Sequence, residues 1–186
     1  MILVHRVEAT AKLPKRLSSQ MRIRRGNPAD AKAIACIQVR GWHAAYKNIM
    51  PRDHLAAMTV SARESVWNQL LADGVTFISE TDDGIHGFCS VGAVRDDDLQ
   101  ISNVGEIYAL YVEPDLWRSG IGQALCNAGT TWLGKESYEA ASLWVLEANA
   151  IGRAFYEKVG FAPDGRTKVY RANDRDLLEL RYTMTL

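Results

Sequence analysis

The residues whose types and spacing could support chemistry stand in one stretch, YALYVEPDLWRSGIGQAL, from Tyr108 to Leu125. A run with the β-branched and aromatic content of a strand ends at Pro114 and leads through Gly120 and Gly122 into a helical pattern. Glycine is costly inside a helix and useful where the backbone bends or comes close to a ligand. Such a turn presents unpaired backbone N–H groups at the positive end of a helix dipole, so it predicts a site for phosphate or pyrophosphate.

The sequence patterns of two familiar nucleotide-binding sites do not match this stretch. The dinucleotide fingerprint needs a third glycine where Leu125 stands, and it follows a first strand. The phosphate loop of nucleotide hydrolases ends in Gly-Lys-Ser or Gly-Lys-Thr, which the sequence lacks. A structural alternative stays open at this point, because Gly120 and Gly122 can serve the packing of a tight strand-to-helix turn alone.

Hydrophobic periodicity and turn residues predict the elements that must position this turn. Asn27 is placed to cap a first helix. A second helical pattern contains Ser61 and Glu64 at the spacing of a capping box. Strands and helices mixed in this order indicate an α+β sheet. The predicted strands are 21–25, 75–80, 85–94, 106–112, 141–146, 167–170 and 177–186, and the predicted helices are 27–46, 50–74, 122–135 and 150–160.

Composition limits the classes of protein to which the turn can belong. With 186 residues, 47% hydrophobic and 24% charged, the chain has the composition of one globular domain. The formal net charge of zero gives no electrostatic footprint for nucleic acid, and no apolar run reaches the roughly 20 residues needed to span a bilayer. Cys36, Cys89 and Cys126 lack metal-ligand spacing and indicate a reduced, cytoplasmic compartment. We therefore expect no metal and no nucleic-acid or membrane partner.

The charge is concentrated at the N-terminus. Residues 1–25 contain seven basic residues and one acidic residue, a net charge of +6. This leader lacks the continuous apolar core of a secretory signal, and a transit peptide is the remaining targeting alternative. We interpret residues 1–20 as a basic, poorly ordered extension and residues 21–186 as the single folded domain.

Two segments, GEIYALYVEPDLWRSGIGQAL and LWVLEANAIGRAFYEKVGF, closely resemble the central motifs of the GNAT superfamily of acyl-CoA-dependent N-acetyltransferases. The resemblance extends from about Met21 to the C-terminus, because GWHAAYKNIMP is also similar to the early helices of a bacterial subgroup. It implies a three-layer α/β sandwich within the α+β class, with a mixed, strongly twisted central sheet of about six to seven strands flanked by about four helices. The resemblance also implies that the sheet is splayed, so that the pantetheine arm of acetyl-CoA lies between the fourth and fifth strands.

The resemblance assigns a set of residues to acetyl-CoA. The family's pyrophosphate loop reads Arg/Gln-x-x-Gly-x-Gly/Ala, and its first position here is Trp117, whose indole cannot replace Arg or Gln at a phosphate. Ser119 is expected to add a hydroxyl donor, Asn149 to cap the next helix as well as bond the cofactor, and Arg153 to face the cofactor or solvent. The cofactor-binding residues implied are Leu110, Tyr111, Val112, Trp117, Arg118, Ser119, Gly120, Ile121, Gly122, Gln123, Asn149 and Arg153.

Acetyl transfer from a thioester to an amine needs a neutral amine and a proton for the departing thiolate. Tyr156 matches the family's general acid, since an unperturbed tyrosine pKa of about 10 leaves it protonated, and a ring packed on the sheet is the structural alternative. Glu106 matches a general-base glutamate found in some branches of the family, with a solvated strand end as the alternative. His43 is a second candidate base, and Trp42 and Tyr46 beside it are expected to line the acceptor pocket.

These residues predict a cytoplasmic acyltransferase. It moves an acetyl group from acetyl-CoA to a primary amine of a small molecule or protein by direct attack in a ternary complex, without a metal. The alternative is a non-catalytic acyl-CoA-binding module, which Trp117 favours and which the presence of Tyr156 and Glu106 opposes. The run Asp96–Asp98 is either an attraction for a cationic amine or a solvated loop. A homodimer is compatible with the family.

Overall fold

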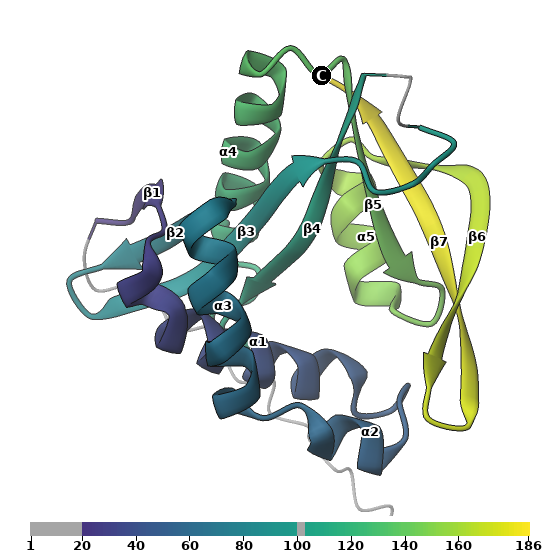
Figure 1. The fold of residues 1–186 in the computed structure, drawn as a ribbon, viewed down its shortest axis with the longest axis horizontal. Coiled ribbons are helices and arrows are strands. Elements are labelled where there is room, and N and C mark those ends of the chain that lie inside the picture. The colour runs from purple at the N-terminus through teal and green to yellow at the C-terminus, as the bar shows by residue number, and fades with distance from the viewer. Residues whose placement is uncertain (1–19, 100–102) are drawn as a thin grey trace, which may run out of the picture.

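Seven strands form one mixed sheet in the order β1-β2-β3-β4-β5-β7-β6 (Figure 1). The computed structural model describes residues 20–99 and 103–186, so the extension predicted for residues 1–20 lies outside the described residues except at Gln20. Neighbouring strands are antiparallel except β4 and β5, which are parallel. The mixed sheet is therefore confirmed. Its strands are β1 (Arg22–Arg25), β2 (Val75–Thr81), β3 (Gly84–Ala93), β4 (Val104–Val112), β5 (Ala140–Leu146), β6 (Ala162–Ala172) and β7 (Arg175–Thr185).

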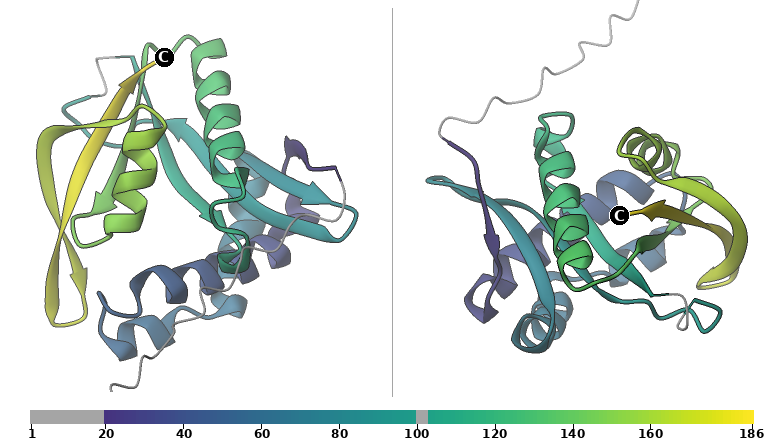
Figure 2. Two further views of the ribbon diagram at one scale, coloured as in Figure 1. Left: turned by 180° about the vertical axis from the view of Figure 1, so that it is seen from behind. Right: turned by 90° about the horizontal axis from the view of Figure 1, so that it is seen from above.

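Helices cover both faces of this sheet. A buried cluster that includes Ile34, Trp67 and Phe88 packs α1 and α3 on one face, which we call the α1 face. A second cluster, which includes Leu125 and Leu143, packs α4 on the opposite face, the α4 face. The view from above in Figure 2 shows α3 and α4 on opposite sides of the sheet. The helices are α1 (Ala31–Tyr46), α2 (Arg52–Ala57), α3 (Val60–Asp73), α4 (Ile121–Lys135) and α5 (Ala150–Lys158), with 3-10 turns η1 (Pro28–Asp30) and η2 (Pro114–Leu116).

Capping residues explain where the first helices begin. The side chain of Asn27 accepts a backbone N–H of the first turn, as predicted. The single helix predicted over residues 50–74 is wrong, because the chain leaves helical geometry at Met58 and resumes it after Thr59. The Thr59 hydroxyl caps α3, so the predicted pairing of Ser61 with Glu64 as a capping box is also wrong. Two helices therefore stand where the periodicity predicted one.

The two halves of the sheet separate between β4 and β5. These strands pair only over Val104–Glu106 and Ala140–Ser142, and beyond that point they diverge. β4 nevertheless stays paired with β3 as far as Val112. The pairing passes over Tyr108, which forms a bulge that turns the second half of β4 relative to the first. One edge of β4 is thus free of a partner strand along its second half, as Figure 1 shows.

Candidate active site

A cleft of about 970 Å³ opens where β4 and β5 separate. Its walls come from α1, the second half of β4, the glycine turn, the start of α4, β5 and α5. The predicted site residues that line it are Trp42, Tyr46, Leu110, Tyr111, Val112, Trp117, Arg118, Gly120, Gly122, Gln123, Asn149 and Tyr156. Predicted residues outside its lining are His43, Glu106, Ser119, Ile121 and Arg153. Tertiary structure thus brings most of the predicted residues to one place.

The free edge of β4 offers unpaired peptide groups to the cleft. The N–H of Glu113 donates to the carbonyl of His86 at 2.9 Å, which fixes the hydrogen-bonded pairs between β3 and β4. Because such pairs alternate with non-bonded pairs in an antiparallel ladder, the peptide groups of Leu110 and Val112 point away from β3 and toward the cleft. An extended ligand that carries amide groups can pair with them as an added strand would.

Trp117, the position that departs from the expected phosphate-loop pattern, has a structural role. Its indole N–H donates to the carbonyl of Val112 at 2.9 Å, and its ring packs against the cluster on the α4 face. The indole therefore ties the glycine turn to the end of β4. The Leu110 peptide and the Val112 N–H remain for a ligand. A tryptophan at this position keeps the shape of the turn without a cationic side chain.

The glycine turn ends in an uncapped helix start. Gly120 is the N-cap of α4 and has a φ of 92°, a left-handed conformation that favours glycine. Among the described residues, no side chain hydrogen-bonds to the first-turn amides of α4. A Cβ placed on Gly120 would meet no protein atom within 4 Å, so the space in front of these amides is open. Open amides at a helix N-terminus suit an anionic group such as pyrophosphate.

Three tyrosines converge on the cleft. Tyr156 comes from α5, Tyr46 from the end of α1, and Tyr111 from β4. Burial raises the pKa of all three hydroxyls, and it holds those of Tyr156 and Tyr111 well above their ordinary range. Beside the larger effect of burial, Tyr111 lowers the pKa of Tyr46 and Tyr46 raises the pKa of Tyr111. These groups stay protonated at neutral pH, so they can serve as proton donors and not as bases.

Asn149 connects β5 to α5. Its side-chain oxygen accepts the N–H of Gly152 at 3.0 Å, which confirms the predicted helix cap. Asn149 also lowers the pKa of Tyr46 against the larger effect of burial. Both residues line the cleft, so the cap of α5 lies in its wall. A bond from Asn149 to the cofactor stays a prediction.

Three side chains expected near acetyl-CoA are engaged elsewhere. The Ser119 hydroxyl donates to the Leu116 carbonyl at 2.6 Å, so its contact with a phosphate stays a prediction that would require this bond to be exchanged. Ile121 is buried in the core, where only its backbone remains available to a ligand. Arg153 turns toward β7 and donates to the Tyr182 hydroxyl at 3.1 Å. The Arg153 guanidinium is therefore engaged by other groups of the protein and does not line the cleft.

Neither predicted base is presented to the cleft. Glu106 is 2% exposed on the α1 face, and Arg95 donates to both of its carboxylate oxygens, with the Arg95 Nε at 3.0 Å. The Arg95 backbone N–H also donates to the same carboxylate. His43 is exposed on the outer side of α1 and does not line the cleft. Sequence reasoning placed both residues next to the chemistry, whereas strand pleat and helix rotation direct them elsewhere.

An aromatic wall that the sequence only partly indicated closes the cleft on the α1 side. The rings of Trp42 and Tyr46 meet edge to face at 4.7 Å between centroids, and the indole nitrogen of Trp42 is buried without a partner among the described residues. His54 of α2 contacts the Tyr170 hydroxyl at 2.9 Å and the Asn173 side chain at 3.1 Å. These contacts tie α2 to the β6–β7 hairpin. No local pattern signals His54 or Tyr170, because the contact joins segments 116 residues apart.

The loop after β3 is fixed across the α1 face of β5 and β7. Asp96 accepts the indole N–H of Trp144 at 2.9 Å and the guanidinium of Arg181 at 3.4 Å, and Asp98 accepts from Arg181 at 2.8 Å. Arg181 is itself buried. Both carboxylates are therefore ion-pair partners of Arg181, and the Asp98 side chain is also 41% exposed, as a solvated loop predicts. Attraction of a cationic amine by this run stays a prediction.

Comparison with known proteins decides the family. Residues 39–161 match the model of the acetyltransferase (GNAT) family. This chain belongs to the GNAT acetyltransferase family. It is 30% identical over 127 residues to the uncharacterized N-acetyltransferase YuaI of Bacillus subtilis, covering 68% of this chain and 72% of the relative. The chain is a GNAT N-acetyltransferase.

Solved structures of other acetyltransferases have the same fold. A GCN5-related N-acetyltransferase from Rhodopseudomonas palustris superposes with a TM-score of 0.72 at 21% identity, over 92% of this chain and 99% of that chain. The PaiA N-acetyltransferase from Thermoplasma acidophilum, in complex with coenzyme A, gives 0.68 at 18% identity, over 90% and 99% of the two chains. The GNAT fold expected from the sequence is confirmed.

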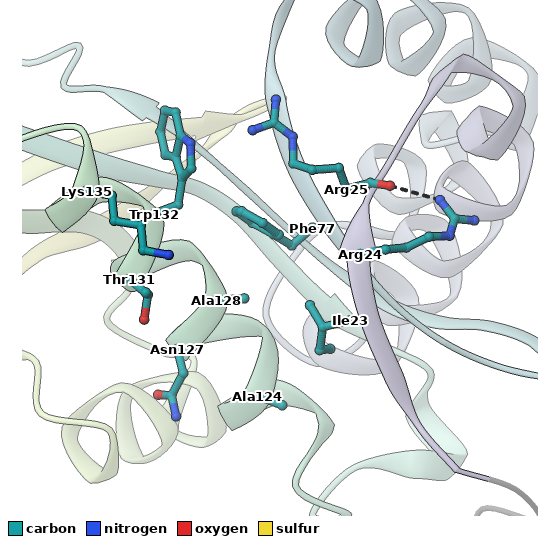
Figure 3. A pocket seen from close by; sticks show the side chains of 10 residues that line it. All are labelled: Ile23, Arg24, Arg25, Phe77, Ala124, Asn127, Ala128, Thr131, Trp132 and Lys135. Atoms are coloured by element: carbon teal, nitrogen blue, oxygen red, sulfur yellow. Dashed lines mark hydrogen bonds between the residues drawn. The ribbon is translucent and has the colours of Figure 1, made fainter.

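A second hollow in this acetyltransferase lies apart from the cleft. It has a volume of about 560 Å³ and lies between β1, β2 and α4 (Figure 3). Figure 3 shows Phe77 and Trp132 near the Arg25 side chain, whose guanidinium carbon is 5.8 Å and 5.9 Å from the two ring centroids. Its lining contains no residue predicted from the sequence to bind acetyl-CoA or the acceptor.

Metal and cysteine chemistry find no support in the part of the chain that the structure describes. No group of three or more His, Cys, Asp or Glu side chains is arranged to hold a metal in residues 20–99 and 103–186. Cys126 is 1% exposed inside α4, and burial raises the pKa of its thiol to about 12. A thiol that stays protonated is a poor nucleophile, which agrees with a core role. In the same residues, no helix is long and apolar enough to cross a bilayer.

The Glu106–Arg95 contact leads to a prediction for this enzyme. Glu106→Gln is expected to lower the free energy of unfolding by about 1–3 kcal/mol, because a charged hydrogen-bonding group is lost. The pH profile of kcat/KM should keep its shape, since Arg95 already engages the carboxylate. Urea denaturation and a pH series measure the two quantities. A variant that loses one limb of the pH profile would restore Glu106 as a candidate base.

Proposed function

We propose that residues 21–186 form one catalytic domain that transfers an acetyl group from acetyl-CoA to a primary amine by direct attack in a ternary complex. The observation that carries the proposal is the cleft, which joins an open β4 edge, an uncapped helix start and a protonated tyrosine. Each of these serves one need of the reaction: binding of an extended amide chain, binding of a pyrophosphate, and supply of a proton.

The cleft fits the chemical parts of acetyl-CoA. The peptide groups of Leu110 and the N–H of Val112 suit the amides of a pantetheine arm. The backbone amides from Arg118 to Gln123 suit the pyrophosphate, and this contact needs no particular side chain at position 117. A related fold binds coenzyme A, which supports the assignment. No metal is needed for either contact.

Tyr156 is the proposed general acid. Its hydroxyl lies in the cleft and stays protonated, because burial raises its pKa. The hydroxyl gives its proton to the sulfur as the carbon–sulfur bond breaks, and Tyr46 and Tyr111 nearby keep the surroundings of that hydroxyl polar and neutral. The amine enters from the α1 side, where Trp42 and Tyr46 form the wall.

Calorimetric titration with acetyl-CoA tests the proposal, with CoA and NADH as comparison ligands. We expect micromolar binding of acetyl-CoA and CoA and none of NADH. Release of free thiol on addition of an amine mixture then separates an enzyme from a binding module. Binding without thiol release from any amine would favour the acyl-CoA-binding module. Absence of acetyl-CoA binding would overturn the proposal.

A further inference from the structure

The chain holds one of its own ammonium groups between an aromatic ring and a carboxylate. The Lys168 Nζ lies 4.0 Å from the centroid of the Trp144 ring and 3.7 Å from a carboxylate oxygen of Glu179. An aromatic face and a carboxylate are the two groups that attract an alkyl ammonium in proteins. The Lys168 side chain is 45% exposed, so this ammonium is accessible to solvent.

Strand register places these groups beside the cleft. Trp144 faces Arg181 across the β5–β7 ladder, and Leu146 faces Glu179 two residues further on, so Trp144 and Glu179 point to the same face. Leu146 packs with Trp42 and Tyr46, which identifies this as the α1 face. Trp144 also lines the cleft. Glu179 therefore lies on the same face as Trp144 and Leu146, next to the cleft but outside its lining.

Glu179 differs from the other carboxylates of this face in its partners. Arg95 donates to Glu106, and Arg181 donates to Asp96 and Asp98. In the part of the chain that the structure describes, Glu179 has only the longer contact with Lys168 as an ion pair. A carboxylate with one long contact to a partly exposed lysine is easier to redirect to a ligand than one held by several guanidinium hydrogen bonds.

The surroundings of Glu179 set the direction of its titration. Burial raises the pKa of Glu179, and the charges of Lys168 and Arg95 lower it by smaller amounts, while Asp96 raises it. Tyr46 and Tyr170 also interact with this carboxylate, and both stay protonated because burial raises their pKa values. A carboxylate whose pKa is raised above its ordinary value is a stronger base than an exposed carboxylate.

We propose that Glu179 binds the ammonium of the acceptor and takes its first proton, with Trp144 as the aromatic side of the site. The inference rests on the proposed function and names its substrate class: an unbranched primary alkyl amine, the chemistry that Lys168 itself presents there. Lys168 acts as an internal competitor that the acceptor displaces. A free diamine and a lysine side chain share this chemistry.

The proton balance of the step is complete. Glu179 takes one proton from the ammonium and returns it to solvent. The neutral nitrogen then forms a bond to the acetyl carbon as the carbon–sulfur bond breaks. Tyr156 gives its proton to the departing sulfur and regains one from the newly acylated nitrogen. The products are the N-acetylated amine, the CoA thiol and one proton released.

The first experiment compares acceptors with the full-length wild-type protein. 1,5-Diaminopentane and a short peptide with one internal lysine and a blocked N-terminus are the two alkyl-ammonium sources. Glucosamine, whose amine sits on a branched ring carbon, and 4-methoxyaniline, whose amine is aromatic, are the contrasts. We expect kcat/KM for at least one of the two alkyl-ammonium acceptors to exceed kcat/KM for both contrast acceptors. The alkyl acceptor with the higher kcat/KM then shows whether a free diamine or a lysine side chain is preferred.

The second experiment uses matched variants with the best alkyl acceptor. Glu179→Gln should lower kcat/KM by about 100-fold or more and remove the acid limb of the pH profile, because a general base contributes about that factor. Lys168→Met keeps a stem on Trp144 but removes the competing charge, so it should lower the acceptor KM by up to about fivefold. It should also move the acid limb to higher pH, since loss of a nearby cation raises the carboxyl pKa. Glu136→Gln, on the exposed end of α4, is the charge-loss control.

Acetyl-CoA affinity separates failure of this inference from failure of the proposed function. Acetyl-CoA should bind wild type, Glu179→Gln and Lys168→Met equally. If wild type binds acetyl-CoA but acetylates glucosamine or 4-methoxyaniline better than both alkyl sources, the inference is wrong and the proposed function stands. The same holds if Glu179→Gln behaves like Glu136→Gln, or if Lys168→Met leaves both the KM and the acid limb unchanged. If acetyl-CoA does not bind wild type, both are wrong.

Discussion

Replacing Tyr156 with phenylalanine is expected to lower kcat by about 10²- to 10⁴-fold and to leave the affinity for acetyl-CoA almost unchanged. The ring of Tyr156 packs against Phe155 and Phe161, and phenylalanine keeps those contacts. The substitution removes only the hydroxyl, which lies in the cleft with a pKa raised by burial. The expected loss therefore falls on the chemical step.

Steady-state kinetics and calorimetry on the same preparations check this split. Tyr138→Phe is the matched control, because it removes one hydroxyl from a tyrosine between α4 and β5 that does not line the cleft. Equal turnover of Tyr156→Phe and wild type would leave Tyr156 as a packing residue. The proton for the thiolate would then come from Tyr46, Tyr111 or water.

The second large effect is expected at Gly120. Gly120→Val should weaken acetyl-CoA binding by about 100-fold or more, because the side chain projects into the open space before the α4 amides and blocks two or more hydrogen bonds to an anion. A left-handed φ also strains any β-branched residue at this position, by about 1–2 kcal/mol of folding free energy. Strain and blockage must be separated before the binding result can be interpreted.

Gly165 provides the control for strain. It has a φ of 89° and, like Gly120, has no protein atom within 4 Å of a built Cβ, but it lies in β6 and outside the cleft lining. Gly165→Val should lower thermal stability to a similar degree and leave the acetyl-CoA Kd at the wild-type value. Wild-type affinity in Gly120→Val would remove the glycine turn from the cofactor site. A similar loss of affinity in both variants would attribute the effect to folding.

Elements with local signals could be predicted from the sequence. The strand-to-helix turn at Gly120 and the caps at Asn27 and Asn149 depend on groups within a few residues of one another, and the structure has all three. The break at Met58 was missed, because Ser61 and Glu64 have the spacing of a capping box, whereas the residue that caps α3 is Thr59. Periodicity reports which side of a segment is apolar and reports less well where a helix stops.

The hydrogen-bond partners of the predicted site side chains could not be predicted from local signals. Glu106 was expected to reach the amine and instead meets Arg95. Trp117 stands where the family's phosphate loop has Arg or Gln, and its indole donates to the Val112 carbonyl. The bulge at Tyr108 and the register of β5 with β7 determine which residues share a face with the cleft. No spacing in the sequence records a bulge or a register, because both are properties of two strands together.

By itself, the sequence determined the GNAT family, the order of most elements and the backbone turn for an anionic cofactor. Those features rest on short-range hydrogen bonds and on apolar periodicity, and both depend on residues that are close together in the sequence. Only the tertiary structure decided which carboxylate is free to meet an amine. Lys168, Glu179 and Trp144 come together from β6, β7 and β5, and their meeting depends on how three strands pair and on which face each side chain takes.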